Sequence, residues 1–417
     1  MSAVLNSLSL RAFNSSFAFI KELFRAAGAQ SLAIRLWTGE TLWSRSDTKP
    51  EFTIVLKHPG ALRRMFSPAT ELNMGEAYIF DDYDVEGDME AAVRFGTRLM
   101  SLNPGVVAGL RLRRLIKELP SGGPPRKLRS PHLKGHLHSR ERDRAAIRYH
   151  YDVSNNLYSL FLDRRMLYSA AHFSHPDEDL DIAQERKLEA ICRRLRMRAG
   201  ERFLDVGCGW GGLIIYAAKH YGVEAIGVTL SEQQAALANE RIRQAGLGGR
   251  CRVHIRDYRD LEGEGTFHKI ASIGMVEHVG TQNLRSYFQE ISRLLASGGA
   301  LLNSGIARPP WEPAHRKGSF TETYVFPDGD LETIPETIQA AEEARLELDS
   351  AENHRLDYAF TLRHWVRRLQ ARADDARRIA DDVTYRIWRL YMAGSAARFV
   401  RGELDLLFAL FSKSSSA

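Results

Sequence analysis

Residues 204–212, which read LDVGCGWGG, decide the fold of this 417-residue chain. They begin within an apolar, strand-like segment at 202–206 and lead into a helical pattern at 213–220. Glycines between a strand and a helix let the backbone approach a ligand closely, and the amino end of the helix attracts negative charge. The turn therefore predicts a site for a nucleotide-like ligand, either a dinucleotide or S-adenosylmethionine.

Strand-like and helical segments alternate after this turn. Apolar segments at 223–229, 252–256, 267–273 and 300–303 are predicted as strands, and 232–245 as a helix. Such alternation indicates an α/β, Rossmann-like fold, in which a parallel sheet carries helices on both faces. Ligands in this fold bind beyond the carboxyl ends of the strands.

The end of the second strand separates the two ligands. Dinucleotide sites, and many S-adenosylmethionine sites, place Asp or Glu there to hold ribose hydroxyls, but this strand ends at Thr229-Leu230-Ser231. Thr229 and Gln233 can instead form hydrogen bonds with a ribose. Ser231 and Gln234 have the spacing of a helix cap. The missing carboxylate argues against a dinucleotide.

Composition divides the chain into three parts. Residues 1–118 are predicted as a small N-terminal domain with lipid or dimer contacts, 119–146 as a basic linker rich in Pro and Gly, and 147–417 as the catalytic domain. The net charge is +6, yet residues 111–148 contain twelve basic and three acidic side chains. The basic character therefore belongs to one segment.

Several classes of protein are excluded. Cys192, Cys208 and Cys251 form no CxxC pair, so neither a disulfide framework nor a metal site is expected. No apolar run approaches the roughly 18–20 residues that cross a bilayer, and the N-terminus makes a poor signal peptide. The basic run has few aromatic residues, which argues against nucleic acid. These features predict a cytoplasmic protein.

Five segments together resemble the cyclopropane fatty acid synthase family. They are LDVGCGWGG (204–212), GVTLSEQQ (227–234), RDYRDL (256–261), SIGMVEHVG (272–280) and HYDVSNNLY (150–158). The resemblance covers residues 147–410, and the first block is similar to the smaller domain of bacterial members. It implies an S-adenosylmethionine-dependent methyltransferase that acts on cis double bonds of phospholipid acyl chains.

The resemblance also implies a set of cofactor contacts. The family's Tyr-Ser pair lies near the methionine part of the cofactor, the glycine turn and the second strand hold its centre, and a later loop lies on the adenine side. The matching residues are Tyr168, Ser169, Gly207, Gly209, Trp210, Thr229, Gln233, Asp257 and Tyr258.

The catalytic positions match the family only in part. Its base is a bound bicarbonate, held by a Glu, a Tyr, a His, a Cys and a backbone contact. Glu277 matches the Glu and Tyr358 the Tyr, whereas Ala170 replaces the Cys and Asn303 the His. Asn cannot carry a positive charge or shuttle a proton as His can. Bicarbonate binding, and with it ring closure, is therefore left open.

Methylation of an alkene leaves a carbocation, and the lost proton decides the product. Loss from the new methyl group closes a cyclopropane, whereas loss from a neighbouring carbon gives a methyl-branched or methylene chain. Two alternatives remain: an altered relative that binds lipid without turnover, and a methyltransferase for another unsaturated lipid.

The acyl chain resides in a bilayer, so such an enzyme must meet a membrane, here the inner membrane face. The basic segment suits anionic phospholipid, and apolar helical faces expected at 13–24 and 404–411 suit the interface. The same faces would equally suit a core or a homodimer.

Overall fold

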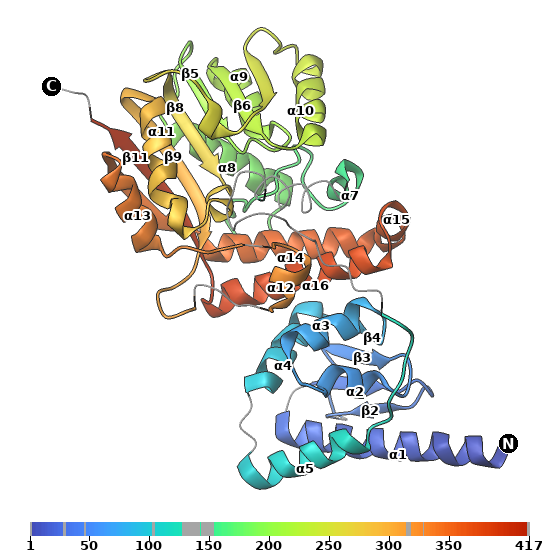
Figure 1. Ribbon diagram of the computed structural model, residues 1–417. Coiled ribbons are helices and arrows are strands. Elements are labelled where there is room, and N and C mark those ends of the chain that lie inside the picture. Colours follow the sequence, from blue (N-terminus) through green and yellow to red (C-terminus); the bar gives the residue numbers. More distant parts are fainter. Residues whose placement is uncertain are drawn as a thin grey trace. The chain divides into compact units, whose positions relative to one another are not determined.

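The computed structural model describes residues 2–27, 31–45, 47–101, 105–126, 142, 154–313, 318–327 and 329–414. The chain forms two compact units, which Figure 1 colours along the sequence. Unit 1 comprises Met1–Ser130, Gly318–Val325 and Asp381–Ala397, and unit 2 comprises Pro131–Lys317, Phe326–Ala380 and Arg398–Ala417. Two segments that composition places in the catalytic part thus belong to unit 1.

Unit 1 is built on a four-stranded sheet with the order β2-β1-β3-β4. Its strands are β1 (Leu32–Arg35), β2 (Thr41–Trp43), β3 (Phe52–Leu56) and β4 (Tyr83–Gly87). β1 and β3 are parallel, and the other two pairs are antiparallel. Its helices are α1 (Ser2–Ala27), α2 (Ala61–Phe66), α3 (Glu71–Ile79), α4 (Met89–Ser101), α5 (Gly105–Glu118), α12 (Phe320–Tyr324) and the part of α16 (Asp382–Arg401) up to residue 397.

Buried arginines hold α16 in unit 1. The Arg386 guanidinium contacts Asp84 at 3.2 Å, and Arg389 donates to the Tyr78 hydroxyl at 2.8 Å. Both arginines are less than 7% exposed, so each requires these partners. The Tyr324 hydroxyl of α12 donates to Glu76 at 3.0 Å.

The linker falls largely outside the described residues. The basic linker residues Lys127, Arg129 and Lys134 are not among the described residues. Residues 150–153 of the HYDVSNNLY motif are not among them either. Arg126, expected to be exposed in this linker, is instead half-buried in unit 1, where it forms ion pairs with Asp82 and Glu76. The Arg126 guanidinium is therefore paired with carboxylates of unit 1.

Unit 2 contains a seven-stranded sheet with the order β10-β11-β9-β8-β5-β6-β7. The strands are β5 (Arg202–Val206), β6 (Glu224–Thr229), β7 (Cys251–Ile255), β8 (Phe267–Ile273), β9 (Leu295–Ala307), β10 (Leu346–Asn353) and β11 (Asp405–Lys413). The first five form parallel pairs, and β11 is antiparallel to both β9 and β10. The predicted α/β fold is confirmed, with all five predicted strands.

The prediction of an apolar helical face at 404–411 is wrong. These residues form most of β11, an inner strand in which Ala409 pairs with Asn303 of β9. A strand buried on both faces is a continuous apolar run, which periodicity cannot distinguish from a buried helix.

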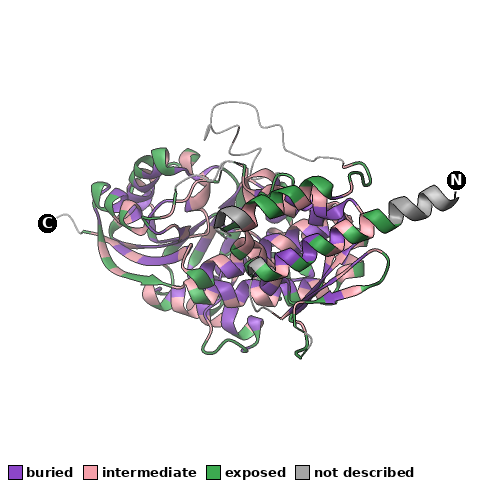
Figure 2. Ribbon diagram, turned by 90° about the horizontal axis from the view of Figure 1, so that it is seen from below, coloured by how far each residue is buried: buried purple, intermediate pink, exposed green. Residues whose placement is uncertain are grey.

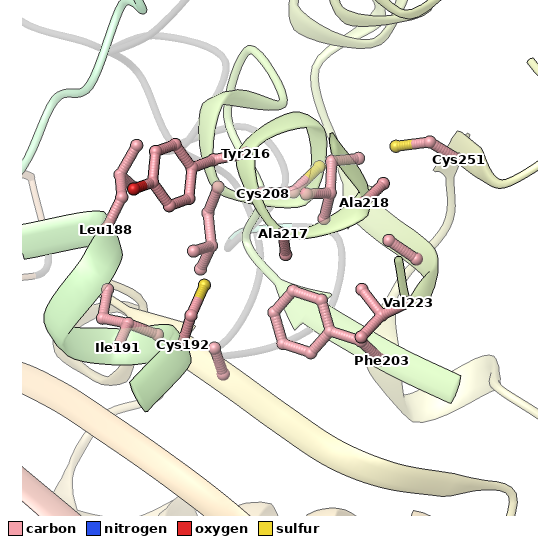
Figure 3. Packing of buried hydrophobic residues seen from close by; sticks show 14 of the residues in the cluster. Leu188, Ile191, Cys192, Phe203, Cys208, Tyr216, Ala217, Ala218, Val223 and Cys251 are labelled. Atoms are coloured by element: carbon pink, nitrogen blue, oxygen red, sulfur yellow. The ribbon is translucent and has the colours of Figure 1, made fainter. Parts of the chain in front are cut away.

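Helices cover both faces of this sheet. α8 (Leu180–Arg194), α9 (Gly212–Tyr221) and α10 (Glu232–Gln244) pack on one face, where Phe203 lies among the residues of Figure 3. α11 (Leu284–Leu294) and α13 (Ile334–Glu343) pack on the other, around Leu204. Adjacent strand residues thus point to opposite faces. Figure 2 shows the buried residues along these strands and the inner sides of the helices.

The remaining helices of unit 2 are α7 (Asn155–Ser159), α14 (Arg355–Ala371), α15 (Ala373–Ile379) and the 3₁₀ turns η1 (Tyr258–Asp260), η2 (Val276–His278) and η3 (Thr281–Asn283). Within the described part of the chain, no helix combines the length and apolarity needed to cross a bilayer.

Candidate cofactor and catalytic site

A cavity lies at the carboxyl ends of β5, β6 and β8 in unit 2. Eight of the nine predicted cofactor residues line it, Gln233 being the exception. These eight are Tyr168, Ser169, Gly207, Gly209, Trp210, Thr229, Asp257 and Tyr258. The structure thus brings together segments that are far apart in the sequence, at the position where this fold binds ligands.

The glycine turn forms the floor of the cavity. Gly207 and Gly209 have φ angles of +78° and +52°, which side chains other than glycine rarely adopt. A Cβ atom on Gly207 would lie 3.0 Å from Met275 Cγ and would narrow the cavity. The Trp210 indole is buried and donates to Asn155 Oδ1 at 2.7 Å. The turn therefore presents backbone to a ligand.

The structure brings Gln234, and not the predicted Gln233, to the cavity. Gln234 lines it and accepts a 2.7 Å hydrogen bond from Thr229 Oγ1. Gln233 is exposed, and its backbone carbonyl accepts from Asn155. One position along a helix rotates a side chain by about 100°, so adjacent glutamines face different surroundings. Ser231 caps α10 through the Gln234 backbone N–H, as expected.

This difference predicts a contrast between adjacent substitutions. Gln234→Ala should weaken S-adenosylmethionine binding about tenfold, because it removes one hydrogen-bonding group at the ribose position. Gln233→Ala should leave the affinity within about twofold. Isothermal titration of both variants measures the difference in affinity. Equal affinities would show that Gln234 does not make the ribose contact in preference to Gln233.

Sequence reasoning missed a buried charged group behind Ser169. The Lys187 ammonium donates to Ser169 Oγ at 2.8 Å, and Gln184 Nε2 donates to the Ser169 carbonyl at 2.9 Å. Burial lowers the pKa of Lys187 to about 7 and raises the pKa of Asp205 to about 7. The sequence could have revealed Asp205 as a buried group, because it is a carboxylate inside the apolar strand at 202–206. It gave no such indication for Lys187, because lysines on helices are ordinarily exposed.

An aromatic cluster joins Tyr168 to Tyr358. Tyr168 stacks on Trp365 of α14 with ring centroids 5.1 Å apart, and its ring meets Tyr158 edge-on at 5.3 Å. Trp365 also contacts the Tyr358 ring at 6.1 Å. Trp365 is fully buried, so it fixes both tyrosines relative to the cavity.

The adenine-side loop is held by its own charges. The Asp257 carboxylate accepts two hydrogen bonds from the Arg259 guanidinium, one from Nε at 2.9 Å and one from Nη2 at 2.7 Å. The Tyr258 ring meets Tyr287 edge-on, with centroids 5.5 Å apart. Tyr287, which sequence reasoning also missed, donates from its hydroxyl to Asn303 Oδ1 at 3.0 Å.

Glu277 lies on η2, between cavity-lining residues. Met275, His278 and Val279 line the cavity on either side of it. Glu277 Oε1 accepts from the Ile306 backbone N–H at 2.7 Å, while Oε2 is shielded from solvent and has no partner. Burial raises the pKa of Glu277 to about 7. Its carboxyl group can therefore exchange a proton near neutral pH.

Ala170 and Tyr358 belong to neighbouring segments. Ala170 is buried, and the next residue, Ala171, donates its N–H to Thr361 Oγ1 at 2.9 Å. Thr361 lies one helical turn from Tyr358 on α14. The Ala170 side chain offers no hydrogen-bond donor.

The residues at the family's bicarbonate positions do not fit that anion well. Asn303 is fully buried and its Nδ2 has no partner, so it contributes a neutral amide where a cation would be needed. Ala170 contributes only its backbone, so it supplies no side-chain donor to an anion. Bicarbonate therefore has no role in the chemistry proposed for this site.

The parallel strands and the cavity at their carboxyl ends define a Rossmann-like α/β protein with a site for a nucleotide-like ligand. A family model described as mycolic acid cyclopropane synthetase matches residues 138–408, and a model described as a domain of unknown function matches residues 19–98. The chain belongs to the mycolic acid cyclopropane synthetase family, which confirms the resemblance found in the sequence.

Named relatives agree with this assignment. A probable fatty acid methyltransferase of Pseudomonas putida is 37% identical over 90% of both chains. The cyclopropane-fatty-acyl-phospholipid synthase of Escherichia coli is 34% identical over 66% of this chain and 70% of that protein.

Solved structures agree as well. The cyclopropane synthase MmaA2 from Mycobacterium tuberculosis has a TM-score of 0.62 at 27% identity, over 68% of this chain and 99% of that one. The mycolic acid cyclopropane synthase CmaA1, solved with S-adenosylhomocysteine, has a TM-score of 0.61 at 29% identity, over 65% and 98%. The protein is thus an S-adenosylmethionine-dependent enzyme of lipid modification.

Proposed function

We propose that this enzyme methylates the cis double bond of an unsaturated phospholipid acyl chain, and that Glu277 takes up the proton released. The product is a methyl-branched or methylene chain. The observation that carries the proposal is the Glu277 carboxyl group, shielded beside the cavity with one free oxygen and a pKa of about 7. A group with this pKa can accept a proton at neutral pH.

The side chains divide the work of the reaction. S-adenosylmethionine, when bound, supplies an electrophilic methyl group. Tyr168, Ser169 and the glycine turn hold it in place, and the Trp365 cluster excludes water that would trap the substrate cation as an alcohol. The alkene π electrons would form the new C–CH₃ bond while the methyl–sulfur bond breaks, and that electron pair would stay on the sulfur of the departing S-adenosylhomocysteine. Glu277 then removes a C–H proton, and the C–H electron pair completes a new double bond.

Two observations favour a methylated chain over a ring. Ala170 and Asn303 replace the two side chains that complete the family's anion site. The Pseudomonas relative, named as a fatty acid methyltransferase, matches across 90% of the chain. Cyclopropane formation is the competing outcome.

The site of action follows from the substrate. We propose that the enzyme works in the cytoplasm, peripherally on the inner membrane face, where its basic segment meets anionic phospholipid. A homodimer contact remains a prediction.

Mass spectrometry of lipids from expressing cells tests the proposal. Cells are fed methionine with a deuterated methyl group. Three deuteriums retained in a methylated, hydrogenation-sensitive chain establish proton loss from a chain carbon, and two with a reducible double bond establish a methylene product. Two deuteriums with resistance to hydrogenation establish the ring and overturn the proposed product. No label in any lipid overturns the function.

Restoring the family pattern gives a second prediction. The double variant Ala170→Cys with Asn303→His should increase the cyclopropane fraction at least severalfold, because it returns a cation and a thiol to the anion site. The measurement is the ring fraction in vesicles with and without added bicarbonate. An unchanged fraction would remove these positions from the control of product.

A further inference from the structure

One side of α8 holds both the backbone and the side chain of Ser169. Gln184 and Lys187 are three residues apart, so they lie on the same side of this helix. Gln184 Nε2 donates to the Ser169 carbonyl at 2.9 Å, and Lys187 Nζ donates to Ser169 Oγ at 2.8 Å. Gln184 and Lys187 are 0% and 3% exposed. Two buried side chains of one helix therefore fix Ser169 at two of its atoms.

The Lys187 ammonium determines how the Ser169 hydroxyl group can be used. An ammonium has three N–H donors and no acceptor, so Ser169 Oγ must accept from it. The hydroxyl proton of Ser169 is then directed toward a different acceptor. Ser169 and Lys187 both line the cavity. The O–H group is therefore presented as a donor to a ligand oxygen.

Lys187 is also a buried positive charge at the cavity. Among the described lysine and arginine side chains that line it, Lys187 is the most deeply buried, since Arg256 is exposed and the Arg259 guanidinium is bound to Asp257. A cation attracts an anionic ligand group more strongly in a buried site than in water, because the effective dielectric constant is lower. The anionic group of S-adenosylmethionine is the carboxylate of its amino-acid part.

The negative charges that face Lys187 belong to two buried aspartates. Asp205 lies on β5 and lines the cavity, and Asp163 precedes Ser169 in the chain. Asp163 Oδ1 accepts from the Leu167 N–H at 2.7 Å, which anchors the segment that leads to Ser169. Burial lowers the pKa of Lys187 to about 7, and negative charge on either aspartate opposes this lowering. Both aspartates therefore favour the ammonium form, which is the form that donates to Ser169.

We propose that Lys187 is a positioning residue for the cofactor, and that it holds the Ser169 hydroxyl group so that its O–H donates to the carboxylate of S-adenosylmethionine. Lys187 acts through Ser169, while Gln184 fixes the backbone of the same residue. This assignment concerns the cofactor alone. It is independent of which lipid is methylated and of whether the product is a ring or a methylated chain.

Isothermal titration of the full-length protein with two ligands tests this role. S-adenosylhomocysteine contains the amino-acid part, whereas methylthioadenosine has the same adenosine and sulfur without it. Lys187→Met removes the ammonium and keeps a long side chain, and it should bind S-adenosylhomocysteine at least about tenfold more weakly. Ser169→Ala should show a loss of similar size. Both variants should bind methylthioadenosine within about twofold of wild type.

The double variant separates action through Ser169 from an independent contact. Lys187→Met with Ser169→Ala should bind S-adenosylhomocysteine within about twofold of Lys187→Met alone, because no hydroxyl group is left to hold. A further tenfold loss would show that the two side chains act separately, and it would overturn the positioning role. Lys219→Met is the matched control, since Lys219 is exposed on α9, and it should change neither affinity.

Steady-state kinetics provide a readout that a merely structural role would not give. Lys187→Met should raise the KM for S-adenosylmethionine about tenfold and leave kcat within about threefold, because the contact holds the cofactor equally before and during methyl transfer. Equal losses of affinity for both titrated ligands would show a structural role and overturn the proposal.

Ser169→Ala decides the question even where Lys187→Met does not fold, because it keeps the backbone contact with Gln184. Unchanged affinity of this variant for S-adenosylhomocysteine would overturn the proposal. The expected pattern of affinities in a protein that transfers no methyl group to lipid would instead overturn the proposed function and keep the role of Lys187.

Discussion

Replacing Glu277 by glutamine is expected to lower the rate of product formation about 10³-fold, because a positioned general base contributes about 10²–10⁴ in rate. S-adenosylmethionine affinity should stay within about twofold, since the Glu277 side chain lies outside the cavity lining. The glutamine carbonyl can still accept from Ile306, so the local backbone is retained. Vesicle assays and cofactor titration measure the two effects.

The same substitution should stabilise the protein at alkaline pH. The folded-state pKa of Glu277 is about 7, above its ordinary value near 4.5, so the folded protein binds an extra proton between these values. The contribution of Glu277 to stability is therefore greatest below about pH 4.5 and is lost as the pH rises through 7. Glutamine removes this loss, and its free energy of unfolding at pH 8 should exceed that of wild type by about 3 kcal/mol.

Urea denaturation at pH 5 and pH 8 checks this sign. The gain should be present at pH 8 and nearly absent at pH 5, and the control Glu342→Gln, at an exposed position of α13, should show neither change. A variant that keeps full activity, or that is destabilised at both pH values, would contradict the role given to Glu277.

Truncating Trp365 to alanine should produce the largest loss of stability. Trp365 is fully buried, and removal of a core tryptophan costs about 3–5 kcal/mol in transfer and cavity terms. Tyr168 also loses the ring on which it stacks, so S-adenosylmethionine should bind at least about tenfold more weakly.

Trp365→Phe is the matched control. It retains an aromatic ring, and the Trp365 indole nitrogen has no hydrogen-bond partner to lose. We expect most of the stability and cofactor affinity to return. If the phenylalanine variant binds as weakly as the alanine variant, stacking on Tyr168 is not what positions the cofactor.

The sequence was most informative where side-chain type and backbone shape coincide. A glycine turn between an apolar strand and a helix has few alternatives, and it lies where expected. Periodicity was insufficient for β11, because an inner strand and a buried helix share the same apolar run. The placement of Gln234 depended on helix phase, which a motif match does not resolve.

The buried ionisable groups were hardest to foresee. Glu277 stood out through its place after the fourth predicted strand, but its shielded oxygen arises from packing against β9. Lys187 carried no signal at all, because a lysine on a helix ordinarily faces solvent. Only the fold shows that it is buried, since its burial depends on contacts distant in the sequence.

Unit 1 is assembled from segments that are translated at very different times. Asp84 and Tyr78 leave the ribosome early, but their partners on α16 follow roughly 300 residues later, about 15–60 seconds at ordinary translation rates. During that interval Asp84 and Tyr78 lack Arg386 and Arg389, the arginines that they contact in the folded unit. This unit therefore completes its folding only near the end of translation, after the sheet of the other unit has largely emerged.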